Sequence, residues 1–166
     1  MLDEATVDDL PAIVAIYNDV IATTTAIYRD RDDPIALADR AAWLHERQAA
    51  GFPVLVVRDE STRAPVALAS YGPFKTSPPG YAATVEHTVH VAPTHRGGGL
   101  GTQLVEHLVT HAAVRGFHMM VGLIDAANAG SIRLHERLGF RQVARLPEVG
   151  RKDGAWMDLV IVQRAL

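Results

Sequence analysis

The stretch His95-Arg96-Gly97-Gly98-Gly99-Leu100-Gly101-Thr102 places four glycines within five consecutive positions. Residues 84–91 before it alternate like a strand, and residues 100–115 after it follow helical spacing. The first turn of a helix has backbone N–H groups without partners, and the helix dipole favours negative charge there. Glycines permit positive φ and let a ligand approach the backbone, while Arg96 adds a fixed positive charge. The stretch therefore predicts a binding site for a phosphate-bearing ligand.

Apolar spacing outside this stretch predicts the other elements. Thr6 and Asp9 resemble a capping box for a first helix, and Asp33-Pro34 is a good start for a second. The expected helices span 10–20, 34–50, 100–115 and 128–138, and the expected strands span 54–57, 65–71, 84–91, 118–124, 141–146 and 156–163. Asp153-Gly154 supplies turn residues between the last two strands. This order predicts one α/β domain over residues 1–166, built around a mixed sheet.

Composition narrows the class of protein. The chain has 166 residues, which fits one domain, and 48% of them are hydrophobic. A net charge of −3 and a pI near 6.2 argue against a general nucleic-acid binder. There are no cysteines, no apolar run long enough to span a membrane, and no secretory signal pattern at the acidic N-terminus. We expect a cytoplasmic protein without nucleic-acid or membrane partners.

Two common phosphate-binding motifs do not fit the glycine stretch. The dinucleotide fingerprint needs glycines at its first, third and sixth positions, and counting from Gly97 the sixth position is Thr102. A P-loop needs Gly-Lys followed by Ser or Thr, and the chain contains no such triplet. The ligand is therefore expected to be a different phosphate-bearing molecule.

Two motifs resemble those of the GCN5-related N-acetyltransferases (GNAT). Arg96-x-x-Gly99-x-Gly101, after a strand that ends Val89-His90-Val91, resembles their acetyl-CoA loop. Asn128-x-x-Ser131-x-x-x-His135-x-x-x-Gly139-Phe140 is similar to their second motif. The resemblance implies a mixed, mostly antiparallel sheet flanked by about four helices, with acetyl-CoA as cofactor. The cofactor-binding residues that it implies are Val89, His90, Val91, Arg96, Gly97, Gly98, Gly99, Leu100, Gly101, Thr102, Asn128 and Ser131.

From about residue 17 to residue 163, the chain is similar to the phosphinothricin and methionine sulfoximine acetyltransferase branch. The similarity is carried by Thr84-Val85-Glu86-His87, Arg133-Leu134-His135-Glu136, and Val149-Gly150-Arg151-Lys152 with Gly154-x-Trp156-x-Asp158. It implies acetylation of the amine of a small amino-acid-like substrate by a homodimer. The chain departs from the branch at Gly98, where relatives often have a basic residue, and at Ala82 and Ala83, where close relatives have larger ones.

Two residues are candidates for the chemistry. Glu86 lies on the polar face of the strand that leads into the glycine stretch, and we expect it to act as the general base that takes a proton from the amine. His135 stands where many GNAT members have a tyrosine that protonates the thiolate. Two roles for His135 stay open, a general acid toward the sulfur or a polar contact that positions cofactor and helix. His90, where the branch often has tyrosine, either lines the pocket or fills the strand face.

The acceptor side is less defined by the sequence. Candidate substrate-binding residues are Ile27, Tyr28, Phe74, Lys75, Tyr81, Arg151 and Lys152, although Ile27 and Tyr28 could equally be a packing anchor. His107 and His111 have a metal-compatible spacing on a helix but no third ligand nearby, so no metal is expected. Other functional hypotheses are acetylation of another small amine or of a peptide N-terminus, and a non-catalytic acyl-CoA sensor. The joint presence of Glu86 and His135 favours an enzyme.

Overall fold

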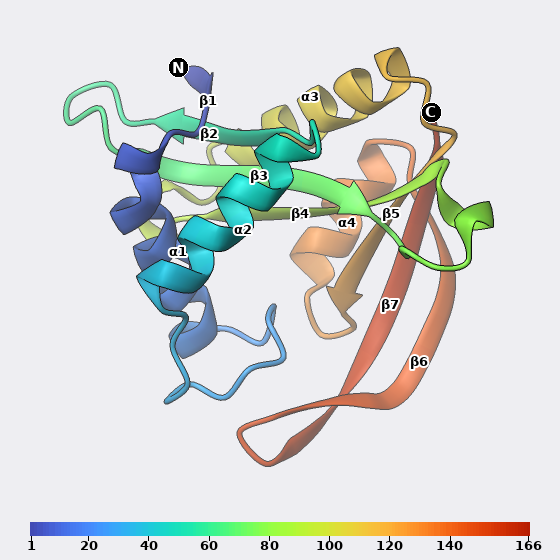
Figure 1. Cartoon of the computed structure of the whole chain (residues 1–166). Helices are drawn as coiled ribbons and strands as arrows, with labels where there is room; N and C mark the ends of the chain where they lie inside the picture. The colour runs from blue at the N-terminus through green and yellow to red at the C-terminus, as the bar shows by residue number, and fades with distance from the viewer.

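A seven-stranded sheet in the order β1-β2-β3-β4-β5-β7-β6 runs through the computed structural model, which describes residues 1–166 (Figure 1). Only the β4–β5 pair is parallel, so the expected mixed, mostly antiparallel sheet is confirmed. The strands are β1 (Leu2–Glu4), β2 (Val54–Arg58), β3 (Pro65–Pro73), β4 (Thr84–Val91), β5 (Met119–Asp125), β6 (Arg141–Lys152) and β7 (Ala155–Ala165).

Four α-helices cover the two faces of the sheet. They are α1 (Leu10–Thr23), α2 (Leu37–Ala49), α3 (Leu100–Val114) and α4 (Ala129–Arg137), with 3-10 turns η1 (Val7–Asp9), η2 (Pro79–Tyr81) and η3 (Pro93–His95). Helices α1 and α2 pack on one face with a core that includes Ile13, Leu44 and Leu68. Helix α3 and the end of α4 pack on the other face, with Leu104 and Leu108 among the buried side chains. Figure 1 shows α1 and α2 together on the side of the sheet opposite α3 and α4.

The second helix begins later than the sequence predicts. Asp33-Pro34 does not start it, because the side chain of Asn18 holds the backbone of Ile35 in an extended segment. Asn18 Oδ1 accepts from the Ile35 N–H at 2.8 Å, and Asn18 Nδ2 donates to the Ile35 carbonyl at 3.1 Å. Ala36 is still extended, with ψ of 152°, and α2 follows it. The short strand β1 was not predicted either, since it depends on pairing with β2.

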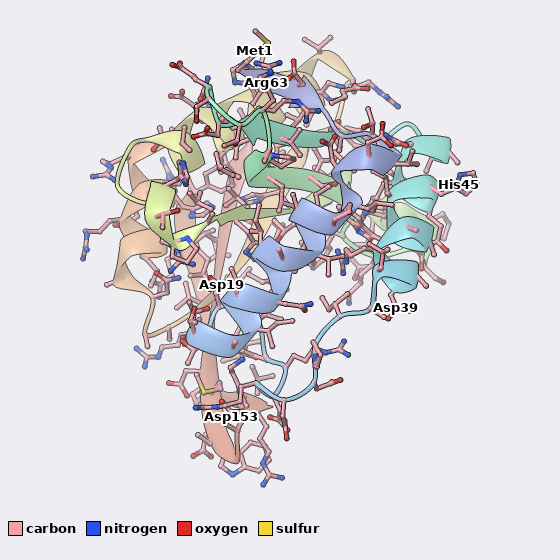
Figure 2. All side chains as sticks on the ribbon, turned by 90° about the vertical axis from the view of Figure 1, so that its left-hand side faces the viewer. Met1, Asp19, Asp39, His45, Arg63 and Asp153 are labelled. Carbon is pink, nitrogen blue, oxygen red and sulfur yellow. The ribbon has the colours of Figure 1, made fainter.

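The last two strands are longer than predicted but turn where expected. Asp153 and Gly154 both have positive φ, 49° and 82°, as a tight hairpin turn requires. A register shift between Leu146 and Gly150 lets β6 continue beyond the predicted strand end. Figure 2 shows Asp153 at the tip of this hairpin, where its carboxylate accepts from Arg31 at 2.9 Å. The β6–β7 hairpin is thus tied to the segment between α1 and α2.

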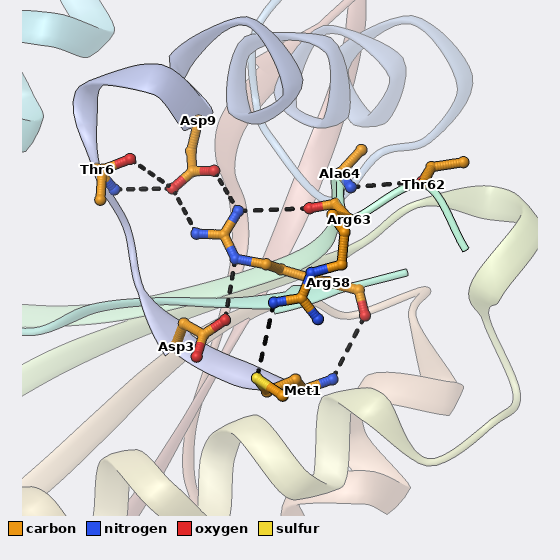
Figure 3. A network of polar contacts seen from close by, with 8 residues as sticks. All are labelled: Met1, Asp3, Thr6, Asp9, Arg58, Thr62, Arg63 and Ala64. Atoms are coloured by element: carbon orange, nitrogen blue, oxygen red, sulfur yellow. Dashed lines mark hydrogen bonds and ion pairs between the residues drawn. The ribbon is translucent and has the colours of Figure 1, made fainter. Parts of the chain in front are cut away.

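A partly buried ion network fixes the N-terminal segment to the sheet (Figure 3). Arg58 at the end of β2 donates to Asp9 at 2.5 and 2.9 Å and to Asp3 at 2.9 Å. The Thr6 N–H donates to Asp9 Oδ2 at 2.8 Å, which confirms the predicted capping box. Asp9 is only 4% exposed, so its charge depends on these donors for compensation.

Candidate active site

Strands β4 and β5 separate halfway along their length. They pair only from Thr84 to His87 on β4 and from Met119 to Gly122 on β5. Beyond this point the edge of β4 that faces β5, residues 88–91, has no strand partner. A Cβ at Gly122 would lie 2.7 Å from His87 Cε1, so glycine leaves room for the His87 ring at the point of separation. The separation leaves unpaired backbone groups of β4 for a ligand to use.

A groove of about 810 Å³ runs from this opening along the glycine loop. Its walls come from the ends of α1 and β4, the loop before α3, and the starts of α3 and α4. Eleven of the sequence-predicted cofactor residues line it, namely Val89, His90, Val91, Arg96, Gly97, Gly99, Leu100, Gly101, Thr102, Asn128 and Ser131. Gly98 is the exception and does not line the groove. The structure therefore brings the two predicted motifs together in one site.

The glycine loop has the backbone geometry of an anion site. Gly97 and Gly99 have φ of 82° and 84°, which side-chain-bearing residues rarely adopt, and Gly99 is the N-cap of α3. The free N–H groups of the first turn of α3 therefore lie beside the groove. Arg96 uses its Nε to donate to the Val91 carbonyl at 3.0 Å, and its Nη2 lies 3.6 Å from Asp19 on α1. Figure 2 shows Asp19 on α1, in the C-terminal part of the helix.

Several groove residues were missed by the sequence analysis. The end of α1 and the residues after it contribute Thr23, Thr24, Thr25 and Ala26, and the last turn of α4 contributes Arg137. The threonines carry no motif, and only the fold brings them to the glycine loop. Arg137 did carry a signal, since it follows His135 by two residues within the second motif. It adds a second guanidinium to the groove.

His87 and His135 form a buried pair that joins β4 to α4. Their Nε2 atoms lie 2.8 Å apart, while His87 Nδ1 faces the Val121 carbonyl at 2.8 Å and His135 Nδ1 faces the Ser131 carbonyl at 2.7 Å. Carbonyls only accept, so both Nδ1 atoms carry hydrogen. The Nε2 contact needs a third hydrogen, and two neutral imidazoles supply two. A third hydrogen would give the pair a positive charge. Burial opposes that charge, because it lowers the pKa of His87 to about 3 and also lowers the pKa of His135.

Asn128 and Ser131 set the start of α4 beneath this pair. Asn128 Oδ1 accepts from the Ser131 N–H at 3.0 Å, so Asn128 is the N-cap of α4. Both residues line a small cavity of about 80 Å³ together with His87 and His135. This cavity opens at the separation of β4 and β5. His90 lies on the other face of β4, where its ring packs against Tyr17 at 4.8 Å.

Glu86 faces a separate pocket of about 100 Å³ on the α1–α2 side of the sheet. The pocket is lined by Trp43, Arg47, Ser70, Tyr71, Pro73, Glu86, His87 and Thr88. Burial raises the pKa of the Glu86 carboxyl, and the charge of Arg47 acts in the opposite direction. His87 and Thr88 border both this pocket and the small cavity, so β4 separates the two spaces by a single strand. A half-buried carboxylate of this kind can accept a proton at the opening.

Three predicted acceptor residues have structural partners. Lys152 is 4% exposed and its ammonium donates to the carbonyls of Ile21, Ile27 and Arg29. The Tyr28 hydroxyl donates to the Asp158 carbonyl at 2.7 Å. A Cβ at Gly150 would lie 2.1 Å from the Tyr28 ring, so the ring occupies the space above that glycine. These contacts anchor the segment after α1 to the β6–β7 hairpin, in agreement with the packing alternative for Ile27 and Tyr28.

The other four candidates form two cation–aromatic clusters. Lys75 lies 5.8 Å from the ring centre of Phe74 and 5.1 Å from that of Tyr81. Arg151 lies 5.6 Å from the Trp156 ring on the hairpin. None of these residues lines the pocket around Glu86 or the groove. Phe74 directly follows Pro73, which lines the pocket around Glu86.

Two further sequence expectations concern metals and membranes. His111 Nδ1 contacts the Tyr71 hydroxyl at 2.7 Å and His107 Nδ1 contacts the Gln103 carbonyl at 2.9 Å, so each histidine has a partner within the protein. No group of three metal-ligating side chains is gathered anywhere in the chain. None of its helices combines the length and apolar character needed to cross a bilayer.

A separated strand pair, a phosphate-compatible glycine loop and a half-buried carboxylate near them fit an acyl-CoA-dependent transferase. The chain belongs to the acetyltransferase (GNAT) family, whose sequence model matches residues 13–140. It is 44% identical over 160 residues to an L-methionine sulfoximine/L-methionine sulfone acetyltransferase from Pseudomonas aeruginosa, covering 96% of this chain and 91% of the relative.

Solved structures agree with this assignment. A ribosomal-protein-alanine N-acetyltransferase from Brucella melitensis superposes with a TM-score of 0.94 at 41% identity, covering 100% of this chain and 99% of the other. A phosphinothricin acetyltransferase from Sinorhizobium meliloti in complex with acetyl-CoA gives a TM-score of 0.93 at 31% identity, covering 100% and 88%. The chain is an N-acetyltransferase that uses acetyl-CoA. The positive-φ glycines, the free amides of α3 and the two arginines fit the phosphates of that cofactor.

Replacing Gly99 by valine should weaken acetyl-CoA binding by about tenfold or more. A side chain at φ of 84° costs about 1–2 kcal/mol, and the loop can avoid this cost only by leaving its anion-binding conformation. Gly98→Ala is the matched control, because Gly98 has no positive φ and its Cβ would meet only the His95 carbonyl, at 3.8 Å. Titration calorimetry with acetyl-CoA measures both. Equal affinities in the two variants would contradict the assignment of the loop.

Proposed function

We propose that this enzyme acetylates the α-amine of a small amino-acid-like substrate of the methionine sulfone, methionine sulfoximine or phosphinothricin type. The observation that carries the proposal is the Glu86 carboxylate, half-buried in a small pocket at the point where β4 and β5 separate. The names of the Pseudomonas and Sinorhizobium relatives support this substrate class. A pocket of about 100 Å³ suits the reacting end of a small molecule better than a folded protein surface.

In the proposed mechanism Glu86 is the general base. An α-amine is mostly protonated at neutral pH and must lose a proton before it can attack. Burial raises the pKa of Glu86, which makes the carboxylate a stronger proton acceptor. Acetyl-CoA, when bound, supplies the acetyl group as an activated thioester. The edge of β4 at Val89, His90 and Val91, which has no strand partner, offers backbone groups that orient this ligand across the strand from Glu86.

We assign His135 the positioning role rather than that of an acid. Its two ring nitrogens face the Ser131 carbonyl and His87, and its side chain is buried, so no N–H is free to reach a sulfur in the groove. Burial also lowers its pKa, which removes the proton that an acid would need. A thiol has an ordinary pKa of about 8.5 and is largely protonated near neutral pH without help from the protein. His135 therefore fixes α4 and its groove residues against β4.

A thiol-release assay across a panel of acceptors tests the proposal. Acetyl-CoA is supplied with methionine sulfone, methionine sulfoximine, phosphinothricin, simple alkylamines and short peptides with N-terminal alanine. We expect release of the CoA thiol with the amino-acid analogues at the highest kcat/KM. Preference for the peptides would instead match the name of the Brucella relative. Acetyl-CoA binding without thiol release from any acceptor would identify a sensor and overturn the proposal.

We further propose that the enzyme is a cytoplasmic homodimer that associates through the β6–β7 hairpin. Large apolar side chains of this hairpin are exposed, namely Val143 by 49%, Val149 by 54% and Trp156 by 63%. Trp156→Lys should therefore shift the protein to a monomer in light-scattering chromatography. Val114→Lys is the control, since Val114 is 83% exposed at the end of α3 and belongs to neither strand of the hairpin. A variant at Trp156 that keeps the wild-type mass would contradict this interface.

A further inference from the structure

Arg47 on α2 reaches across the sheet to the position of Glu86. A Cβ placed on Gly72 of β3 would lie 1.0 Å from Arg47 Nη1, so the guanidinium occupies the space that a side chain would fill. Gly72 is the cross-strand partner of Glu86 in the β3–β4 ladder. The absence of a side chain at residue 72 therefore brings a cation to the pocket that contains the carboxylate.

The guanidinium of Arg47 has no anionic or hydrogen-bonding partner within the protein, and its aromatic neighbour is Phe52, whose ring centre lies 6.0 Å away. No carboxylate lies within 4.0 Å of it, and its side chain makes no hydrogen bond. Burial lowers the pKa of Arg47, which reflects the loss of water around the charge. Taking a charge out of water costs free energy unless an opposite charge or hydrogen bonds compensate it. Arg47 and Glu86 thus stand in one pocket as a cation and an anion, neither of which is neutralised by an ion pair.

This arrangement matches the charges of an α-amino acid. The amine and carboxylate of such a molecule are attached to one carbon, and they carry opposite charges in the zwitterion. Guanidinium binds carboxylate through two parallel hydrogen bonds. Resting on the proposed function, we infer that Arg47 binds the α-carboxylate of the acceptor while Glu86 faces its amine. Arg47 is then the residue that selects free amino acids over simple amines and peptides.

The neighbouring arginine on the same face of α2 has a different environment. Arg40 lies over the Tyr17 ring at 4.1 Å and the Trp43 ring at 4.7 Å, so its guanidinium is stacked on aromatic groups. Arg40 does not line the pocket of Glu86, whereas Arg47 does. The carboxylate site is therefore assigned to Arg47 alone.

The test compares two acceptors that differ only in the carboxylate, L-methionine sulfone and its carboxamide. Loss of one partner of a buried charge pair lowers affinity by about 30-fold or more. We expect Arg47→Gln to lower kcat/KM for methionine sulfone by at least about 30-fold, and kcat/KM for its carboxamide by less than about threefold. Arg47→Lys should recover part of the kcat/KM for methionine sulfone. The control is Arg63→Gln, because Arg63 is an exposed residue in the β2–β3 turn (Figure 2). Equal losses on both acceptors in Arg47→Gln would overturn the inference.

Gly72→Ala provides a second variant that keeps the charge. The three atoms nearest to its Cβ all belong to the end of the flexible Arg47 side chain, so we expect the guanidinium to be displaced and the strand to stay in place. We expect Gly72→Ala to lower kcat/KM for methionine sulfone selectively over its carboxamide, as Arg47→Gln does. Calorimetric binding of methionine sulfone in the presence of CoA separates this inference from the proposed function. If the wild type binds methionine sulfone, Arg47→Gln does not, and neither protein acetylates it, the role of Arg47 is supported and the proposed reaction is contradicted. If the variant binds methionine sulfone as the wild type does, the role of Arg47 is contradicted.

Discussion

Glu86→Gln is expected to lower kcat by about 10²–10⁴, the usual contribution of a general base, while acetyl-CoA binding stays unchanged. Glutamine keeps the size of the side chain but cannot accept a proton. Glu86 also lies across β4 from the groove, so its replacement leaves the glycine loop intact. Steady-state kinetics with methionine sulfone and calorimetry with acetyl-CoA measure the two quantities. Glu60→Gln, at an exposed turn, is the control. A kcat within about threefold of wild type would remove Glu86 from the chemistry.

The pH dependence of this enzyme follows from the same carboxylate. A general base works in its deprotonated form, so kcat falls as pH drops through the pKa of Glu86, which burial raises. Arg47 opposes this rise, and His87, which also borders the pocket, is kept neutral by burial. Arg47→Gln should therefore move the acid limb of the kcat profile to higher pH. A limb that moves to lower pH in this variant would show that Arg47 does not act on Glu86.

Arg58→Met is expected to lower the free energy of unfolding by about 3 kcal/mol, because it leaves the carboxylate of Asp9 buried without its cation. Asp9 is 4% exposed, and both of its oxygens accept from the Arg58 guanidinium (Figure 3). Urea denaturation followed by circular dichroism measures the change. Arg63→Gln serves as the exposed control from the same β-hairpin. A decrease in the free energy of unfolding below about 0.5 kcal/mol would contradict this account, because exposed surface ion pairs contribute that little.

The same network predicts how stability depends on pH. Burial acts to raise the pKa of Asp9, but hydrogen bonds from Arg58 and Thr6 outweigh it and hold the pKa below the ordinary value of 3.8. A lowered folded-state pKa contributes stability above the unfolded pKa, and this contribution is lost as pH falls through the folded pKa. Wild type should therefore lose more stability than Arg58→Met between pH 5 and the acid limit. An equal loss in both proteins would contradict this account of Asp9.

The cofactor half of the site could be predicted from local sequence. The glycine loop, the strand before it and the N-cap Asn128 each depend on neighbours within a few residues, and the structure gathers them as expected. The turn at Asp153-Gly154 was predictable for the same reason, since Asp and Gly are the residues that tolerate the positive φ of such a turn. The limits of β6 were not, because a register shift depends on its pairing with β7.

The acceptor half depends on contacts between distant elements. Lys152 resembles a substrate-binding cation in sequence, but the carbonyls after α1 surround its ammonium in the fold. The role of Arg47 could not be predicted from the sequence because Arg47 belongs to no motif. Its position in the pocket depends on the packing of α2 over Gly72. One signal was present, since Arg40, Leu44 and Arg47 share the inward face of α2, where basic residues are unusual. The later start of α2 likewise depends on Asn18 of α1.

Product stoichiometry tests the central claim most directly. The enzyme is incubated with acetyl-CoA and L-methionine sulfone, the released thiol is titrated, and the acceptor is analysed by mass spectrometry. We predict one N-acetylated acceptor for each CoA thiol released, with both signals reduced together in Glu86→Gln. Thiol release without an acetylated amine, or acetyl-CoA binding without either product, would contradict acetyl transfer to an amino-acid amine.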